Sequence, residues 1–183
     1  MASVIPLGLL LALHTPQSDS SHWSIQVGTM FSVRTLGSED PRIGKVFSIA
    51  YGRPEPRLRL GKYQPELVFE ATVLPSSSRG YVDIAPDRTT SMGVLAIARY
   101  RITPWRGART FLDLGWGIQY STQATSDQPS QWNSTPSLGL GTEVDWGRKD
   151  GYVLARWFHS SNAGTKGNNP GWNQIWVVCG VKL

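Results

Sequence analysis

The sequence predicts an all-β protein, an eight-stranded antiparallel up-and-down transmembrane β-barrel that occupies residues 21–183. Three observations lead to this fold class. Apolar and polar residues alternate with period two from Trp23 onward, as they do in strands whose two faces meet different surroundings. Turn-rich segments interrupt the alternation at regular intervals, which indicates a meander. The strands run for about 10 to 13 residues, long enough to cross a bilayer when tilted.

The first four predicted strands cover residues 23–34, 43–53, 63–74 and 91–103. Segments rich in Gly, Pro, Ser and Asp, which turns favour, follow them at 37–41, 52–61, 75–80 and 104–107. The first and third strands each have one apolar face and one polar or small face. The apolar residues are Trp23, Ile25, Val27, Phe31 and Val33 in the first strand and Leu67, Phe69, Ala71 and Val73 in the third.

The last four predicted strands cover residues 109–121, 135–147, 150–161 and 173–182, with turns at 125–130, 147–151 and 162–171. The fifth and sixth strands alternate strictly, and their second face mixes glycines with charges. The apolar residues are Leu112, Leu114, Trp116, Ile118 and Tyr120 in the fifth strand and Leu138, Leu140, Val144 and Trp146 in the sixth.

Alternation alone leaves open which face is inside. A soluble sandwich or lipocalin-like barrel turns its apolar face inward, whereas an outer-membrane barrel turns it toward lipid. Glycines mixed with charges of both signs suit a narrow eight-stranded lumen. Aromatic residues also lie near strand ends, where interfacial girdles form. These residues are Trp23, Trp105, Tyr120, Trp132, Trp146 and Trp172.

The N-terminus carries a candidate signal peptide, which we place at residues 1–20. Residues 4–13 have the length and apolarity of a signal-peptide core, although no positive residue precedes them. We expect cleavage between His14 and His22. A mispredicted start or a buried N-terminal segment is the alternative interpretation. A leader fits the barrel prediction because it permits export.

Composition excludes several classes of protein. Residues 4–13 form the longest stretch free of strongly polar groups, too short for a membrane-spanning helix. The single cysteine, Cys179, excludes an intramolecular disulfide framework and a multi-cysteine zinc site. The net charge of +5 comes from 18 basic and 13 acidic residues that are scattered along the chain, and no nucleic-acid-binding signature accompanies it. We therefore expect no nucleic-acid partner.

The segment from Arg156 to Gly164 carries the most distinctive chemistry in the chain. His159 is the last histidine and lies at the end of the seventh predicted strand. His159 and Ser161 are two residues apart, so both point to the apolar, outward side. A histidine within hydrogen-bond reach can remove the proton of a serine hydroxyl and so make it a nucleophile. The alternative is a pair of exposed polar residues at a strand end.

This stretch resembles the lipid A 3-O-deacylases of the PagL type, which are outer-membrane esterases built on eight-stranded barrels. The similar residues are His159-Ser160-Ser161-Asn162-Ala163-Gly164, then Asn169-Pro170-Gly171-Trp172-Asn173 and a final strand. The resemblance implies that His159 is the general base and Ser161 the nucleophile. It also implies an oxyanion hole formed by Asn162 and the Gly164 backbone, an active site open toward the bilayer, and no metal or organic cofactor.

One position departs from the family pattern. The third catalytic residue of the family is a glutamate, and the matching position here is Asn173. By parity Asn173 faces outward beside His159 and Ser161, so its side chain can accept from the imidazole and hold its tautomer. An amide cannot stabilise an imidazolium by charge, so we expect a weaker base and expect Asn173→Glu to raise hydrolysis. Pairing across the 147–150 turn places His159 opposite Leu138, far from the carboxylates Glu143 and Asp145, which we expect in the lumen.

Other chemical residues have simpler interpretations. We interpret Asp83 and Asp87 as solvated turn residues rather than a cation site. We expect Glu66 and Glu70 to pair with Arg99 or Arg101 in the lumen, and Cys179 to act as a small hydrophobe. Guanidinium and ammonium groups suit phosphates, so three loop cations are candidates for contacting the lipid A phosphates. They are Arg79, Arg88 and Lys166.

The sequence therefore predicts an outer-membrane esterase of a Gram-negative-type bacterium that removes an ester-linked acyl chain from lipid A of lipopolysaccharide. The main alternative is a non-catalytic small outer-membrane barrel with a structural or lipid-binding role, and a soluble lipocalin-like carrier is a third. Expected partners are lipopolysaccharide and outer-membrane lipids. The sequence leaves open whether the barrel forms a homodimer, which acyl position is cut, and which chain length is preferred.

Overall fold

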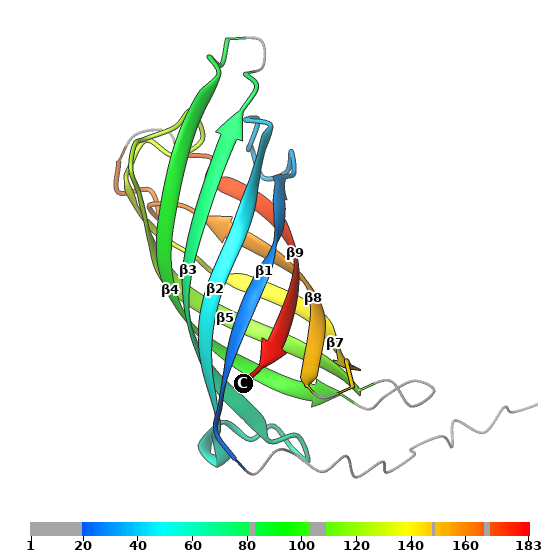
Figure 1. The fold of residues 1–183 in the computed structure, drawn as a ribbon. Helices are drawn as coiled ribbons and strands as arrows, with labels where there is room; N and C mark the ends of the chain where they lie inside the picture. Colours follow the sequence, from blue (N-terminus) through cyan, green and yellow to red (C-terminus); the bar gives the residue numbers. More distant parts are fainter. Residues whose placement is uncertain (1–19, 81–82, 103–108, 148, 167–168) are drawn as a thin grey trace, which may run out of the picture.

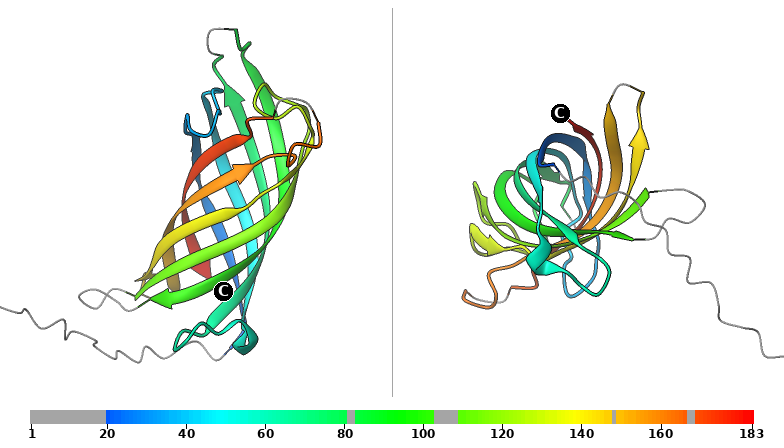
Figure 2. Two further views of the ribbon diagram at one scale, coloured as in Figure 1. Left: turned by 180° about the vertical axis from the view of Figure 1, so that it is seen from behind. Right: turned by 90° about the horizontal axis from the view of Figure 1, so that it is seen from below.

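The computed structural model describes residues 20–80, 83–102, 109–147, 149–166 and 169–183. These residues form a closed antiparallel barrel with eight strand positions, which we call staves, as the sequence predicts (Figures 1 and 2). Neighbours along the sheet follow the order β4-β3-β2-β1-β9-β8-β7-β5-β6, and β4 pairs with β5 to close the barrel. The strands are β1 His22–Ser32, β2 Arg42–Pro54, β3 Pro65–Ser78, β4 Asp87–Ile102, β5 Arg109–Ser121, β6 Trp132–Ser134, β7 Ser137–Asp145, β8 Asp150–Ser160 and β9 Trp172–Lys182.

Strands β6 and β7 form one stave. Ser134 pairs with Ile118 of β5, and Ser137 pairs with Gly115, so the register does not change between the two strands. Pro136 lies between them and has no N–H to donate, which interrupts the ladder without shifting it. The sixth predicted strand, 135–147, therefore begins three residues too late, because it leaves out the residues of β6.

Strands β3 and β4 are longer than predicted. Residues 75–78 were expected in a turn, but they continue β3 and pair with residues 87–90 of β4. Pro75 lies opposite Thr90 in this extension. Asp87, expected in a solvated turn, begins β4 and forms an ion pair with Arg42. This Ser-rich segment of β3 pairs with β2 on one side and β4 on the other, although its composition resembles that of a turn.

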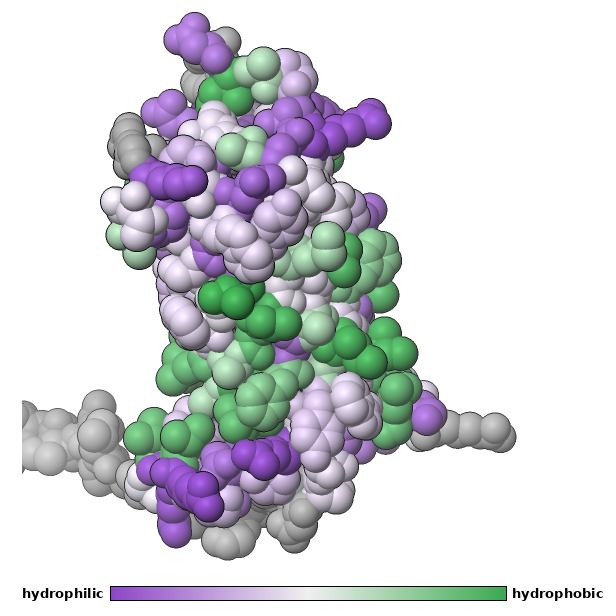
Figure 3. Space-filling model, turned by 90° about the vertical axis from the view of Figure 1, so that its left-hand side faces the viewer, coloured by the Kyte–Doolittle hydropathy of each residue, from purple (hydrophilic) through white to green (hydrophobic). Residues whose placement is uncertain are grey.

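The apolar face of the barrel points outward, as predicted, and this arrangement contradicts the soluble lipocalin-like alternative. Alternate residues of the strands are exposed, among them Ile25, Phe47 and Trp116. Figure 3 shows an apolar belt between hydrophilic ends on one side of the molecule. Trp23, Trp132 and Trp146 are exposed near strand ends, as girdle residues should be.

Trp172 and Trp105 were also predicted to lie in the aromatic girdle. Trp172 is fully buried, and the Cζ of the Arg42 guanidinium lies 5.4 Å from the centroid of the Trp172 ring. The assignment of Trp172 to the girdle was therefore wrong. The reason is parity, because Trp172 lies one residue from the outward-facing Asn173. Trp105 lies outside the described residues.

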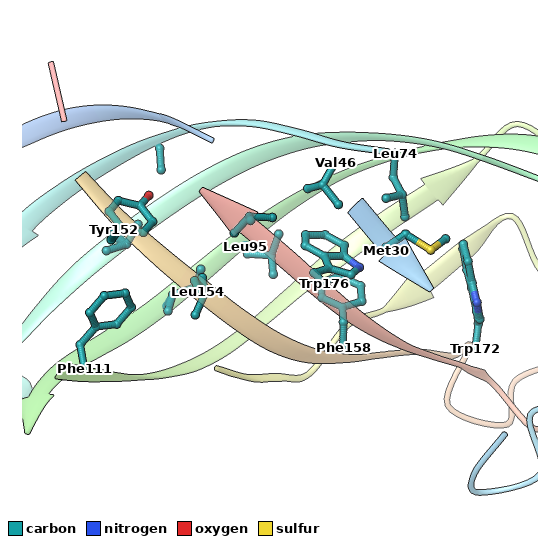
Figure 4. Close-up of a cluster of buried hydrophobic side chains, with 14 residues drawn as sticks. Met30, Val46, Leu74, Leu95, Phe111, Tyr152, Leu154, Phe158, Trp172 and Trp176 are labelled. Atoms are coloured by element: carbon teal, nitrogen blue, oxygen red, sulfur yellow. The ribbon is translucent and has the colours of Figure 1, made fainter. Parts of the chain in front are cut away.

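The lumen is filled with side chains. An apolar cluster runs through it, in which Phe158 stacks on Trp176 at 4.4 Å between ring centroids (Figure 4). Arg156 donates to Glu70 at 3.1 Å and to Asp113 at 3.3 Å, and Asp113 also accepts two bonds from Arg99. These contacts connect β3, β4, β5 and β8 across the barrel. Side chains thus occupy the interior as in other small barrels.

The expected partners of the lumen acids were partly wrong. Glu70 pairs with Arg156 rather than Arg99 or Arg101, and Glu66 pairs with His22 at 3.2 Å. Glu66 lies beside Arg99 in the β3–β4 ladder, yet both acids pair with residues of strands that are not their neighbours, so strand pairing does not determine the partner. Glu143 faces the lumen as expected and contacts Arg101 and Lys182, whereas Asp145 is exposed and caps the following turn through the Gly147 N–H.

The two ends of the barrel differ. The C-terminus and the turns after β2 and β7 lie at one end (Figure 1), and the loops after β1, β5 and β8 contact one another at the other end. We call this second end the loop end. Within the described residues, no helix is long and apolar enough to cross a membrane. The predicted signal peptide, apart from Ser20, lies outside the described residues.

Candidate active site

His159 and Asn173 form a cross-strand pair near the loop end of the barrel. β8 and β9 place the two residues directly opposite each other, and Nδ1 of His159 lies 2.9 Å from Oδ1 of Asn173. The Trp157 ring stacks against the imidazole on the same outward face, with centroids 6.0 Å apart. On its other side His159 lies opposite Pro136, not Leu138, so the predicted pairing was off by two residues. The structure therefore brings together the predicted base and its predicted orienting residue.

The Asn173 amide has only one orientation that satisfies its neighbours. Its Nδ2 donates to the backbone carbonyl of Thr35 at 2.9 Å. A carbonyl oxygen can only accept, so the amide oxygen must face His159. Because that oxygen also only accepts, Nδ1 of His159 carries the proton and Nε2 presents a lone pair. The loop after β1 thus selects the imidazole tautomer through Asn173.

Ser161 lies close to the far edge of the imidazole. Its backbone is held by two hydrogen bonds with Ser134, 2.7 Å and 3.0 Å long, which keep its side chain outward beside His159. Gly171 packs against both residues: a Cβ there would lie 2.9 Å from Nε2 of His159 and 3.1 Å from Cβ of Ser161. The imidazole Nε2 and the Ser161 Cβ therefore both lie next to Gly171, where the absence of a Cβ leaves room for them.

The predicted oxyanion donors lie in a tight turn just after Ser161. Ala163 and Gly164 both have positive φ angles, +54° and +77°. The Gly164 N–H donates to Oδ1 of Asn162 at 3.0 Å, and Nδ2 of Asn162 donates to the Lys166 carbonyl at 3.0 Å. Asn162 therefore shapes the turn, and its own backbone carbonyl accepts from Thr165. The assignment of Asn162 and Gly164 to an oxyanion hole stays a prediction.

A buried carboxylate that sequence reasoning missed joins three loops around the site. Asp127 accepts from the Ser38 hydroxyl at 2.7 Å and from the backbone N–H groups of Glu39 and Asp40, each at 3.0 Å. Its backbone carbonyl accepts from the Gly171 N–H at 3.1 Å. Asp127 thus connects the loop that carries Thr35 with the loop that carries Gly171. It lies in a predicted turn of ordinary turn composition, so no sequence signal marks it.

The other candidates lie apart from this site. Cys179 is exposed on the outward face, as expected. The described residues hold no cluster of acids, histidines and cysteines that fits a metal ion, and Asp87 is paired with Arg42. Arg79, Arg88 and Lys166 are exposed at the loop end. Their contact with phosphate stays a prediction.

Comparisons with known proteins point to one family and agree with the barrel fold. A family model described as lipid A 3-O-deacylase (PagL) matches residues 58–182, a range that includes His159, Ser161 and Asn173. Among solved structures, the "Crystal structure of the outer membrane enzyme PagL" matches with a TM-score of 0.60 and 16% sequence identity. That match covers 90% of this chain and 100% of the other, and at this identity it supports the fold. No curated protein matches the chain.

Proposed function

Because the chain belongs to the lipid A 3-O-deacylase (PagL) family, whose model matches more than half of it, we propose that it is an outer-membrane esterase that removes the 3-O-linked acyl chain of lipid A. The observation that carries this proposal is the row formed by Asn173, His159 and Ser161 on the outward face. The Nδ1–Oδ1 contact of 2.9 Å leaves Nε2 available to take the serine proton in the proposed reaction. An outward site is where the acyl chains of a membrane lipid are accessible.

In the proposed mechanism, Ser161 Oγ attacks the acyl carbonyl carbon while its proton passes to Nε2 of His159. The carbon–oxygen ester bond then breaks, and the imidazolium returns its proton to the departing sugar oxygen. Water next attacks the acyl-enzyme, with Nε2 as the base again, and this step releases the fatty acid and restores Ser161. Asn173 holds the Nδ1–H throughout but contributes no charge.

We assign stabilisation of the tetrahedral oxyanion to Asn162 and Gly164. An amide nitrogen has two N–H groups, and the contact with Lys166 uses only one of those of Asn162. The Gly164 N–H bonds to Asn162 in the structure, so a bound oxyanion must replace that contact. A turn that begins directly after the nucleophile suits this role because it holds both donors close to Ser161.

The proposed location and partners follow from the barrel surface. The apolar belt matches a lipid-facing wall, and the site lies toward the loop end, so the substrate reaches it from the surrounding lipid leaflet. We propose lipopolysaccharide and outer-membrane lipids as partners, with Arg79, Arg88 and Lys166 near the lipid A phosphates.

The second candidate function is a non-catalytic barrel with a structural or lipid-binding role. The observation that favours it is the amide at position 173, which cannot stabilise an imidazolium by charge. The two candidates differ in one measurable property, the reactivity of Ser161.

A serine-directed phosphonate tests the proposal. The folded protein in detergent is incubated with a labelled long-chain alkylphosphonate and analysed by peptide mass spectrometry. We expect one adduct on Ser161, which disappears in His159→Ala, while Ser160→Ala retains it. Ser160 is the matched control because it is adjacent but buried in the lumen. Absence of an adduct from the folded barrel would support the non-catalytic candidate.

A further inference from the structure

An apolar trough crosses the outer surface of β1 to β5 and has a volume of about 790 Å³. Two rows of outward side chains form its walls. Its floor is the backbone between the rows, at Gln26, Ser48, Thr72 and Gly93, and the side chains of the first three belong to the inward face. The first row consists of Ile25, Ile49, Ala71, Val94 and Ile118, and the second of Val27, Phe47, Val73, Met92 and Tyr120.

Both rows follow the strand pairing. In the first row Ile118 pairs with Val94, Val94 with Ala71 and Ala71 with Ile49, so each residue lies directly beside the next across one strand. The second row runs parallel to it, two residues further along each strand. The trough is therefore a regular path that crosses the strands and follows the curve of the barrel wall, rather than an irregular depression.

This path leads to Ser161. Ile118 pairs with Ser134 of β6, and Ser134 in turn bridges Ser161, so the first row continues onto the predicted nucleophile. The second row continues from Tyr120 to Trp132, whose ring lies 5.1 Å from that of Tyr120. Trp132 lines the trough and stands at its mouth.

In the opposite direction from Ser161 the row meets the loops. Gly171 packs against Ser161 and the imidazole, and behind it the Thr35 carbonyl holds Asn173. An acyl chain attached at Ser161 therefore has an open apolar path on one side and loops on the other. The trough and the nucleophile form one continuous surface.

We propose that this trough binds the acyl chain of the scissile ester and limits the length of chain that is cleaved efficiently. The inference rests on the proposed esterase function and names a specificity site within it. Surrounding lipid tails are as apolar as the trough, so it selects by shape and packing rather than by hydrophobic transfer. An extended chain lying along the rows places its carbonyl carbon at Ser161.

The spacing of the strands relates each position along the trough to a length of acyl chain. Neighbouring strands are about 4.8 Å apart, so Ile118 lies about 10 Å and Val94 about 14 Å from Ser161 along the row. A carbon–carbon bond of about 1.5 Å advances an extended chain by about 1.25 Å, so these positions correspond to about 8 and about 11 carbons. A large side chain at either position should obstruct chains longer than that.

The experiment uses Ile118→Trp and Val94→Trp with two matched controls, Leu140→Trp and Val153→Trp. The control positions are also apolar and outward but do not line the trough. Each folded barrel in detergent is assayed with esters whose acyl chains have about 6, 10 and 14 carbons, lengths chosen to fall on either side of the two obstructions.

We expect Ile118→Trp to lower kcat/KM about tenfold or more for the two longer chains and less than about twofold for the shortest, because a displaced carbonyl is attacked slowly. Val94→Trp should affect only the longest chain, and the controls should affect none. Equal losses of kcat/KM for all acyl-chain lengths, or the same pattern in the controls, would contradict the proposed role of the trough. If the unmodified protein cleaves no ester, the esterase function itself fails, which is a different outcome.

Discussion

At the scale of single residues, Asn173 occupies the position at which the sequence resemblance leads us to expect a glutamate. The structure gives this residue two functions, since Oδ1 accepts from His159 and Nδ2 donates to the Thr35 carbonyl. A carboxylate performs only the first. Asn173 is also completely buried, so a longer side chain has no solvent to enter. The amide is thus adapted to the loop that covers it.

We therefore predict that Asn173→Asp, which keeps the size of the side chain, lowers kcat about tenfold because a carboxylate oxygen then faces the Thr35 carbonyl oxygen. A loss of that size corresponds to about 1.4 kcal/mol. The structure argues for the same direction in Asn173→Glu, against the rise expected from the family pattern. Steady-state kinetics on a short-chain ester measures both variants. A rate above that of the unmodified protein would show that charge at this position outweighs the contact with Thr35.

Gly171 supports a second prediction at this scale. It has a φ of +76°, and a Cβ there would lie 2.4 Å from Cε1 of His159. Gly171→Ala should lower kcat about 100-fold, because displacing the imidazole by about 1 Å misaligns the proton transfer. Gly147→Ala is the matched control, since Gly147 has a φ of +83° but open space around it. If both variants lose activity equally, backbone strain rather than the clash is responsible.

Much of this site was predictable from local sequence, and part of it was not. Parity places His159, Ser161 and Asn173 on one face, and a single turn brings the last strand beside them. The contact of Asn173 with Thr35 joins residues far apart in the chain. It depends on the path of the loop after β1, for which strand periodicity carries no information.

At the scale of elements, the loops of the barrel are connected mainly through Asp127. Its carboxylate accepts three hydrogen bonds from the loop after β1, while its backbone holds Gly171. Neighbouring Gln128 donates from Nε2 to the Ser160 carbonyl at 3.1 Å. The elements that orient His159 and Ser161 are thus positioned by one turn between β5 and β6.

We predict that Asp127→Ala lowers kcat about tenfold while KM changes little, because the loop that carries Thr35 loses its anchor on the turn that holds Gly171, without any loss of contact with substrate. Charge-assisted hydrogen bonds of this kind contribute about 1.5 to 3 kcal/mol each. The loss should be partly restored in Asp127→Asn, which retains one acceptor oxygen. A larger effect on KM than on kcat would indicate that Asp127 instead contacts the substrate.

The strand boundaries show how far the sequence alone could define each strand. The eight staves follow from alternation and turn composition, and all eight are present. The end of β3 and the start of β4 differ from prediction because Pro75 and the Ser-rich segment of β3 look like a turn. The start of the sixth stave differs because its ladder continues across Pro136 into β6. Within a barrel a proline loses one hydrogen bond while its neighbours keep the ladder in register. Composition cannot distinguish such an interruption from a turn.

At the scale of the whole molecule, opposite charges in the lumen hold the staves together. Arg156 is 1% exposed and contacts both Glu70 and Asp113, which lie on different strands. Alternation predicts that charges face inward. It does not predict which partners meet across the lumen, because those pairs depend on barrel closure and shear.

Arg156→Met should lower the free energy of unfolding by about 3 kcal/mol, because it leaves two buried carboxylates without their shared cation. Urea titration of the folded barrel, followed by loss of its heat-modifiable gel mobility, measures this change. The double variant Arg156→Met/Glu70→Gln should recover part of the loss. A single variant as stable as the unmodified protein would show that Gln26, Ser48 and Arg99 satisfy the two acids alone.

The central claim is that this barrel uses Ser161 to remove an acyl chain from lipid A. Mass spectrometry of lipid A from a Gram-negative host that expresses the protein tests it most directly, beside a Ser161→Ala variant confirmed as folded in the outer membrane. We predict that lipid A loses the mass of one ester-linked acyl chain only when the serine is present. Unchanged lipid A in both strains, or the same loss with Ser161→Ala, would contradict the claim.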